Sequence, residues 1–345
     1  MSFNVSNASG DELPSAPSPL TLLVIGDPAA GYLKPLAALP SETRIIVSRD
    51  RARLRESAPE ADVILNGDFL DPTLLTETFP YATRVRWVHA LMAGVDKVLS
   101  PEIVASDVPM TNGRGLFRRA LAEWTVGAMV YFAYEFRRLV RNQEAGRWEG
   151  FDHSTLYGRT LGIVGYGSIG QAIAERARPF GMRIVVVRRS QSPAADTLVD
   201  QAYSPDQLNA MLAECDYVVV TTPLTAETRG MIGAPQIAAM KPSAVLINVG
   251  RGAVIDEAAL LAALESGPEG INSGKLHGAA LDVFTTEPLP AGHPFYALEN
   301  VLLSPHTADR SPESRSGAVQ FFIENFERFR KGEPLENVVD KHAGY

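Results

Sequence analysis

Short apolar segments alternate with amphipathic stretches along most of the chain. The first series of apolar segments predicts four strands, at Leu20–Ile25, Arg44–Val47, Asp62–Leu65 and Val85–His89. The second series predicts six more, at Thr160–Val164, Arg183–Val187, Tyr217–Thr221, Ala244–Asn248, His277–Leu281 and Val301–Leu303. Apolar strands that alternate with helices are typical of parallel βα units. The pattern therefore predicts an α/β protein.

Two longer amphipathic segments complete this pattern. Apolar residues recur at helical spacing from Leu116 to Gln143, which predicts one long helix, and a last helix is expected from Pro312 to Arg330. Two other segments carry no such periodicity. Residues 1–19 are rich in Ser, Asn and Pro and are expected to form a disordered tail. Glycine and proline in Pro268–Gly274 predict a surface loop.

Composition and charge narrow the classes of function. A length of 345 residues suggests two domains. The 32 Lys and Arg against 40 Asp and Glu give a net charge of -8, which argues against nucleic-acid or anionic-membrane partners. The single cysteine, Cys215, excludes an internal disulfide and a Cys-based zinc site, and the acids are too scattered to predict a metal site. Without an export signal or a long apolar run, we expect a cytoplasmic protein.

A glycine-rich turn follows the strand Thr160–Val164. It has the sequence Gly165-Tyr-Gly167-Ser168-Ile169-Gly170 and opens a predicted helix. In this strand–turn–helix context the pattern is typical of dinucleotide binding. Gly165 permits the tight turn, Gly167 lets the backbone approach a pyrophosphate, and Gly170 allows close packing of helix on strand. The helix N-terminus then faces the anion.

The end of the following strand indicates which dinucleotide is used. An NAD site usually has an acid there, which accepts a hydrogen bond from the ribose 2′-hydroxyl. This chain instead has Arg188-Arg189-Ser190. Two guanidinium groups and a hydroxyl suit a 2′-phosphate, although a solvated arginine pair at a strand end is the alternative interpretation. We therefore expect NADP(H) to be preferred, with NAD(H) possible.

Three later segments carry candidate catalytic side chains. Arg251, Glu287 and His306 each follow a predicted parallel strand. Ligands of open α/β sheets bind at the carboxyl ends of the strands, so these side chains are expected to converge. Taken singly, each has an ordinary structural explanation as a loop or surface residue. Together, downstream of the glycine turn, they favour a functional site.

The chemistry of these three residues fits reduction of a 2-keto acid. The Arg251 fork can bind a carboxylate and polarise a carbonyl. His306 can give a proton to the forming alkoxide. Glu287 can orient the imidazole and favour its charged form. His89 precedes the Met92–Asp96 segment by three residues. It could touch a substrate and is an alternative proton donor.

At this point the chain resembles the NAD(P)-dependent D-isomer-specific 2-hydroxyacid dehydrogenases, from about Leu20 to Val339. The motifs that carry the resemblance are Gly165–Gly170, Thr222-Pro-Leu-Thr225, Asn248–Gly252, Leu281–Pro288 and Ser304–Thr307. The resemblance implies that Arg251, Glu287 and His306 form a catalytic triad and that Asp282 contacts the nicotinamide carboxamide. It also implies that backbone N–H groups of the Met92–Asp96 loop hold the substrate carboxylate. The remaining binding residues it implies are Ala93 and Gly94 for the substrate, and Ser168, Ile169, Thr222, Pro223, Thr228, Val249, Arg251 and His306 for the cofactor.

The resemblance further implies two doubly wound parallel-sheet domains with an active-site cleft between them. A flavodoxin-like substrate domain would comprise residues 20–115 plus 311–345, and a Rossmann domain residues 116–310. A homodimer is expected through the long Rossmann-domain helix, whose Trp124, Met129, Tyr131 and Phe132 give it more than one apolar face.

Some positions depart from the family's common pattern. The Arg188 segment resembles that of NADPH-using glyoxylate and hydroxypyruvate reductases. Ala308-Asp309 replaces small residues after the histidine, and Arg114, Arg118 and Arg119 make the hinge unusually basic. We therefore expect an NADPH-dependent reductase of small 2-keto acids. A dinucleotide-sensing corepressor of the same fold is the alternative, and an S-adenosylhomocysteine-hydrolase-like enzyme is a more distant one.

Overall fold

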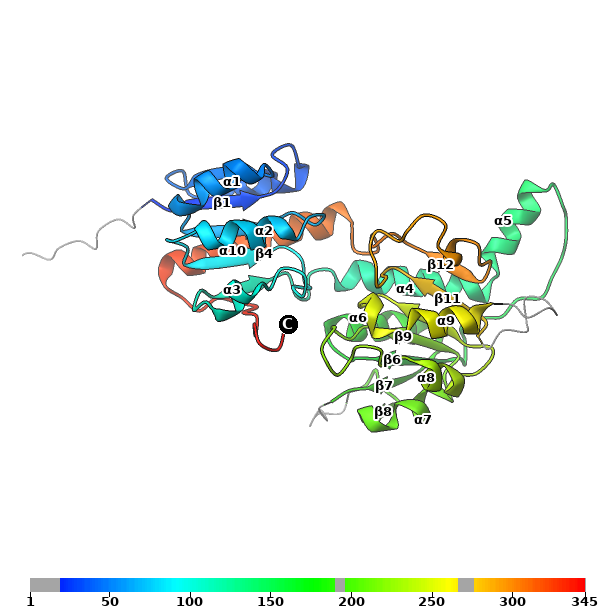
Figure 1. Ribbon diagram of the computed structural model, residues 1–345. Helices are drawn as coiled ribbons and strands as arrows, with labels where there is room; N and C mark the ends of the chain where they lie inside the picture. The colour runs from blue at the N-terminus through cyan, green and yellow to red at the C-terminus, as the bar shows by residue number, and fades with distance from the viewer. Residues whose placement is uncertain (1–18, 190–195, 266–275, 345) are drawn as a thin grey trace, which may run out of the picture.

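A computed structural model describes residues 19–189, 196–265 and 276–344. These residues form two lobes, each built around one sheet (Figure 1). Three sequence predictions fall outside the described residues: the tail up to residue 18, the loop Pro268–Gly274, and Ser190.

The five-stranded lobe is built from the first part of the chain. Its strands are β1 (Thr21–Ile25), β2 (Arg44–Ser48), β3 (Val63–Asn66), β4 (Trp87–Ala90) and β5 (Met110–Asn112). They are all parallel and lie in the order β2-β1-β3-β4-β5. The helices that cover them are η1 (Gly31–Ala38), α1 (Arg51–Ser57), η2 (Ala58–Glu60), α2 (Thr73–Thr78), η3 (Phe79–Tyr81), α3 (Pro101–Ala105) and α10 (Pro312–Lys331).

Alternation along the strands explains how both faces of this sheet are buried. In β1, Leu22 and Val24 belong to the cluster that contains α10, while Leu23 and Ile25 pack with α1, α2 and α3. Successive side chains of a strand point to opposite faces, so an unbroken apolar run is buried on both sides. Helix α10 returns from the end of the chain to this lobe, where Phe322 stacks on Trp87 with ring centroids 5.2 Å apart (Figure 1).

The seven-stranded lobe is built from the middle of the chain. Its strands are β6 (Thr160–Val164), β7 (Arg183–Val187), β8 (Gln201–Tyr203), β9 (Tyr217–Val220), β10 (Val245–Asn248), β11 (Gly278–Leu281) and β12 (Val301–Leu303). They are parallel in the order β12-β11-β10-β9-β6-β7-β8. Its helices are α4 (Arg118–Ala133), α5 (Phe136–Glu144), α6 (Ser168–Ala177), η4 (Arg178–Phe180), η5 (Pro205–Gln207), α7 (Leu208–Leu212), α8 (Ala234–Ala239), η6 (Gly252–Val254), α9 (Glu257–Leu264) and η7 (Pro294–Tyr296).

The strand order of this lobe locates its ligand crevice. Chain order runs outward in one direction from β6 through β7 to β8, and in the other direction from β9 to β12. The switch point therefore lies between β6 and β9. In open α/β sheets, ligands bind outside the carboxyl ends of the strands at that point.

The predicted fold class, with two parallel-sheet α/β units, is confirmed. The prediction of a single helix from Leu116 to Gln143 is wrong. The segment is divided into α4 and α5 at Glu135, whose φ of 50° lies in the left-handed region. The break redirects the chain so that Arg137 donates hydrogen bonds to the carbonyls of Leu298 and Val301, at 3.1 and 3.2 Å. The edge strands β5 and β8 were not predicted.

The chain passes between the lobes twice, before α4 and before α10 (Figure 1). The predicted domain limits of 20–115 plus 311–345, and 116–310, stay predictions.

Within the described ranges, no helix is both long enough and apolar enough to cross a membrane.

Candidate active site

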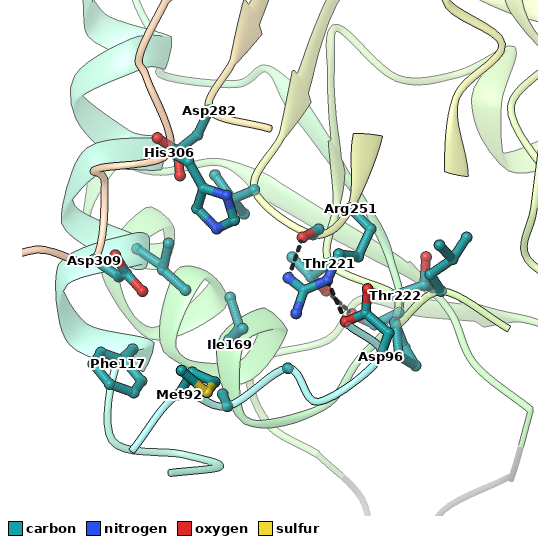
Figure 2. A pocket seen from close by; sticks show the side chains of 18 of the residues that line it. Met92, Asp96, Phe117, Ile169, Thr221, Thr222, Arg251, Asp282, His306 and Asp309 are labelled. Carbon is teal, nitrogen blue, oxygen red and sulfur yellow. Dashed lines mark hydrogen bonds and ion pairs between the residues drawn. The ribbon is translucent and has the colours of Figure 1, made fainter. Parts of the chain in front are cut away.

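One large cavity is lined by residues of both lobes (Figure 2). It collects nearly all of the predicted site residues that the structure describes. Those on its wall are Ala93, Gly94, Gly165, Gly167, Ser168, Ile169, Arg188, Arg189, Thr222, Pro223, Thr228, Val249, Arg251, Asp282, Glu287 and His306. Gly170 does not line the cavity, because it lies where helix α6 packs against strand β6.

The glycine turn has the geometry that a pyrophosphate needs. Gly165 has a φ of 94°, which disfavours other residues, and a Cβ there would lie 2.8 Å from Thr222 Cγ2. A Cβ at Gly170 would lie 2.6 Å from the carbonyl oxygen of Gly165, so glycine lets α6 pack against β6. At Gly167 nothing lies within 4 Å of that position. No side chain of the described residues caps the N-terminus of α6, so its first N–H groups are available to an anion.

Two buried polar atoms at this end of the cavity also fit a dinucleotide. Arg188 Nε and Thr222 Oγ1 are buried and form no hydrogen bond with any residue that the structure describes. Arg188 and Arg189 both line the cavity directly after β7. Buried polar atoms are normally hydrogen-bonded, so a ligand with acceptor oxygens would satisfy them.

Arg251 is presented by a turn that its own neighbours hold in place. The Asn248 side chain accepts a hydrogen bond from the Gly250 amide at 3.0 Å and donates one to the Arg251 carbonyl at 3.1 Å. A Cβ at Gly252 would lie 2.0 Å from the carbonyl carbon of Phe284, so only glycine allows the turn to pack there. The Arg251 side chain is thereby directed into the cavity (Figure 2).

The loop after β4 approaches the guanidinium of Arg251 from the other lobe. Arg251 Nε donates to Asp96 Oδ1 at 2.9 Å, and Nη1 donates to the Gly250 carbonyl at 2.9 Å. A Cβ at Gly94 would lie only 1.2 Å from Nη2, so the absence of a side chain allows this approach. The remaining N–H groups of Arg251 form no hydrogen bond within the described parts of the chain, and they are free to bind a substrate oxygen.

His306 lies on a tight turn at the end of β12. Its φ is 53°, an uncommon value for a non-glycine residue, and such values often occur at functional sites. Asp282 fixes this turn, because its Oδ1 accepts from Ser304 Oγ at 2.7 Å and from the amides of Thr307 and Ala308 at 2.9 and 3.0 Å. Asp282 therefore also holds the backbone that carries His306.

Glu287 lies between His306 and a lysine from the other lobe. Its Oε2 is 3.0 Å from His306 Nδ1 and 3.0 Å from Lys97 Nζ, and its Oε1 accepts from the Phe284 amide. Burial alone would raise the pKa of Glu287. The hydrogen bonds from His306, Phe284 and Lys97 outweigh burial and hold this pKa at about 2. Glu287 is therefore a carboxylate at any ordinary working pH.

His89 does not act as the alternative proton donor at this site. It is fully buried between strands, does not line the cavity, and contacts Trp87 and Phe322. Burial lowers its pKa to about 3, so the ring stays neutral. The hypothesis that it touches substrate is wrong.

Asp96, Lys97 and Asp309 are among the cavity-wall residues that had no assigned role in the sequence analysis. Asp96 and Lys97 follow the glycine of the Met92–Asp96 loop, and Asp309 follows His306 by three residues. Sequence proximity to a motif was the only signal available for them.

Among the described residues, no group of three or more His, Cys, Asp or Glu could hold a metal ion.

Comparison with known proteins assigns this architecture to a family. Residues 126–308 match the model of the D-isomer specific 2-hydroxyacid dehydrogenase NAD binding domain. A glyoxylate reductase of Korarchaeum cryptofilum is 34% identical over 294 residues, which are 84% of this chain and 85% of the relative. The chain belongs to the D-isomer-specific 2-hydroxyacid dehydrogenase family. It is an NAD(P)-dependent dehydrogenase that uses a nicotinamide dinucleotide and acts on 2-keto or 2-hydroxy acids.

Solved structures agree with this assignment. A family member from Aeromonas salmonicida has a TM-score of 0.83 and 33% identity, covering 94% of this chain and 100% of the other. An NADPH-dependent glyoxylate/hydroxypyruvate reductase from Sinorhizobium meliloti, solved with NADP and sulfate, has a TM-score of 0.79 and 30% identity. The match covers 95% of this chain and 100% of that reductase.

We expect Glu287→Gln to change the pH dependence of the dehydrogenase. If His306 is the proton donor, reduction needs its charged form, and a neighbouring carboxylate favours a charged imidazole. In the variant, kcat/KM for reduction should fall more between neutral and alkaline pH than it does in the unmodified enzyme, because Gln lacks the negative charge of Glu287. Oxidation of the hydroxy acid needs the neutral ring and should be relatively spared at neutral pH. Steady-state rates in both directions between pH 5 and 9 measure the effect.

Lys97→Gln is the matched control, because Lys97 contacts the same carboxylate oxygen as His306. Loss of its positive charge should move the same pH midpoint in the opposite direction, by a smaller amount because Lys97 is solvent-exposed. If Glu287→Gln lowers the reduction rate equally at every pH, the carboxylate only orients the imidazole.

Proposed function

We propose that this dehydrogenase reduces glyoxylate, hydroxypyruvate or a similar small 2-keto acid to the D-2-hydroxy acid, and that it prefers NADPH. The observation that carries the proposal is the grouping of Arg251, His306 and Glu287 on the wall that also contains the glycine turn. The curated relatives described as glyoxylate reductases support the substrate class. The Sinorhizobium meliloti reductase supports the cofactor.

Substrate binding would use the free N–H groups of Arg251 together with the backbone of the loop around Gly94. The guanidinium attracts the carboxylate and draws electron density from the keto oxygen. Asp96 prevents the guanidinium from turning away, because it holds Nε at 2.9 Å. Arg251 would thus bind the substrate and polarise the bond that is reduced.

Proton transfer would use His306. Its Nδ1 is engaged by Glu287, so Nε2 is the nitrogen left to face the substrate (Figure 2). When bound, the nicotinamide cofactor supplies the hydride that adds to the keto carbon. The proton from Nε2 goes to the keto oxygen, and His306 is left neutral with its Nδ1–H still bonded to Glu287. In oxidation the same nitrogen accepts the proton.

Closure of the cleft would complete the site. Asp96 and Lys97 come from the five-stranded lobe, whereas their partners Arg251 and Glu287 come from the seven-stranded lobe. These two ion pairs therefore form only when the lobes are together. Exclusion of water strengthens the electrostatic interactions in the site and protects the transferred hydride.

The proposed function is tested by an assay with NADPH and NADH in parallel. With glyoxylate or hydroxypyruvate we expect kcat/KM to favour NADPH at least about tenfold, roughly 1.4 kcal/mol. Arg188→Asp should reverse this preference, because a carboxylate repels the 2′-phosphate and accepts from a 2′-hydroxyl. Equal use of both cofactors by the unmodified enzyme would contradict the NADPH preference. Absence of turnover with any 2-keto acid would favour a dinucleotide-sensing role.

We also propose that the enzyme is a homodimer through the segment that was predicted as one long helix, with α5 rather than α4 supplying the exposed apolar residues. Met129 and Phe132 of α4 are buried in the chain's own core. Exposed apolar side chains occur instead on α5 and just after it, namely Phe136, Leu139, Val140 and Trp148. An exposed apolar patch of this kind is typical of an interface. We further propose that the enzyme is cytoplasmic. The support for this is that the chain has a single cysteine, which suits a reducing compartment.

Sedimentation velocity tests the dimer. Leu139→Ser combined with Trp148→Ser should shift the enzyme from dimer to monomer at micromolar concentration, because both apolar contacts are lost. Leu70→Ser, a similarly exposed leucine in the five-stranded lobe, serves as the control and should leave the sedimentation coefficient unchanged. A monomeric unmodified enzyme would contradict the proposal.

A further inference from the structure

Asp309 differs from the other acids of the cavity wall. In the described part of the chain, the other five wall acids each have a side-chain hydrogen bond or ion pair. These are Asp68, Asp96, Glu227, Asp282 and Glu287. The carboxylate of Asp309 forms none with another described residue. Burial raises its pKa, and the nearby charge of Asp282 adds to this effect, while His306 opposes it.

The backbone around Asp309 is held rigidly. Asp282 binds the amides of Thr307 and Ala308, and the amides of Arg310 and Ser311 donate to the carbonyls of Thr307 and Asp309, at 3.0 and 2.9 Å. This turn joins β12 to α10, and its hydrogen bonds hold the backbone of Asp309 three residues after His306. Removing a carboxylate from water without giving it a hydrogen-bond donor costs free energy. The position of Asp309 on the cavity wall therefore points to a bound molecule that supplies this donor.

The position of Asp309 indicates which part of a substrate it meets. Figure 2 shows Asp309 on the side of the cavity with Phe117 and Met92, across from Arg251, with the imidazole of His306 between them. If Arg251 binds the carboxylate and His306 the keto oxygen, the third substituent of the keto carbon is directed away from Arg251. That substituent would lie near Asp309.

We propose that Asp309 selects 2-keto acids whose C3 carries a hydrogen-bond donor, and that it rejects substrates with a second carboxylate. This inference rests on the proposed function. A hydroxyl at C3 would donate to the otherwise unbonded carboxylate. A carboxylate in the same place would be repelled, and a methyl group would leave Asp309 without a partner. A partly buried carboxylate without a protein partner discriminates between a donor, a methyl group and a second carboxylate, so the preference is set by Asp309 and not by pocket size alone.

The test compares four substrates at saturating NADPH: glyoxylate, pyruvate, hydroxypyruvate and oxaloacetate. They differ in the substituent on the keto carbon, which is a hydrogen, a methyl, a hydroxymethyl and a carboxymethyl group. Each kcat/KM is divided by that for glyoxylate, so a general loss of activity cancels. The unmodified enzyme should prefer hydroxypyruvate to pyruvate by about tenfold or more. Oxaloacetate should be the poorest substrate.

Two variants separate hydrogen bonding from charge. In Asp309→Ala the preference for hydroxypyruvate over pyruvate should fall about tenfold, and relative use of oxaloacetate should rise. In Asp309→Asn the amide oxygen still accepts a hydrogen bond, so most of the hydroxypyruvate preference should persist while oxaloacetate use rises. Asn is nearly isosteric, so this variant keeps the test decisive if the alanine variant does not fold. Glu227→Ala, which changes a wall acid bonded to Thr225, is the control and should not alter the ratios.

Unchanged substrate ratios in both Asp309 variants would overturn the inference and leave the proposed function intact. A uniform loss with all four substrates, with a displaced pH profile, would also overturn it, because Asp309 would then act through His306. No turnover of any 2-keto acid by the unmodified enzyme would instead refute the proposed function itself.

Discussion

Replacement of His306 by alanine is expected to lower kcat for keto-acid reduction by about 10²–10⁴-fold. The imidazole lies on the cavity wall and pairs with the half-buried carboxylate of Glu287. Its loss removes the proposed proton donor and leaves the glycine turn untouched. NADPH affinity, measured by fluorescence titration, should therefore change by only a few-fold, so the defect appears in kcat.

The backbone of His306 suggests a better-matched variant. Its φ of 53° is tolerated by asparagine more readily than by most residues. His306→Asn should preserve the turn and can still donate a hydrogen bond to Glu287, yet it cannot transfer a proton at neutral pH. Both variants should show the same large loss of kcat. A near-normal kcat in either variant would mean that another group, or water, supplies the proton.

The second large effect is expected for Arg251→Lys, which should lower kcat/KM about 10²–10³-fold. Lysine keeps the positive charge but cannot make the fixed fork, which spans Asp96, the Gly250 carbonyl and the substrate. Both the carboxylate and the polarised keto oxygen lose their donor, so KM should rise and kcat should fall. Steady-state kinetics across a range of glyoxylate concentrations separate these two changes.

Asp96→Asn is the control for Arg251. Its amide oxygen can still accept from Arg251 Nε, so the geometry is kept while the negative charge beside the guanidinium is removed. We expect a much smaller loss, below about tenfold, because the fork remains in place. If Arg251→Lys is no worse than Asp96→Asn, the fork geometry does not contribute to catalysis and only the charge matters.

Much of this site could be predicted from sequence because its geometry is local. The turn at Gly165 follows a strand and opens a helix within a few residues, and the β6 and β7 limits agree with the apolar pattern. Arg251 and His306 follow their strands closely, so parallel-sheet topology alone brings them to one edge. In such cases the spacing of the apolar residues locates the ends of the strands, and the site residues follow directly after these ends.

Other features depend on contacts between distant parts of the chain. The break at Glu135 contains neither glycine nor proline, and it is favoured by the contacts that Arg137 makes with carbonyls about 160 residues later. The strands β5 and β8 have only three residues each and contain polar residues, whereas the equally short β12 is wholly apolar and was predicted. The partners of Lys97 and Asp96 lie in the other lobe, so no pattern near them could predict Glu287 or Arg251 as neighbours.

The return of α10 to the five-stranded lobe has a consequence for biosynthesis. Trp87 and the sheet face around it are covered by Phe322 and its neighbours, which the ribosome adds only after the whole seven-stranded lobe. About 235 residues separate Trp87 from Phe322, and at roughly 5–20 residues per second their synthesis takes on the order of 10–50 s. During that interval the nascent chain exposes the apolar sheet face around Trp87 while the later lobe is still being made. The first lobe to be translated is thus the last to finish folding, and a molecular chaperone has its clearest binding target there.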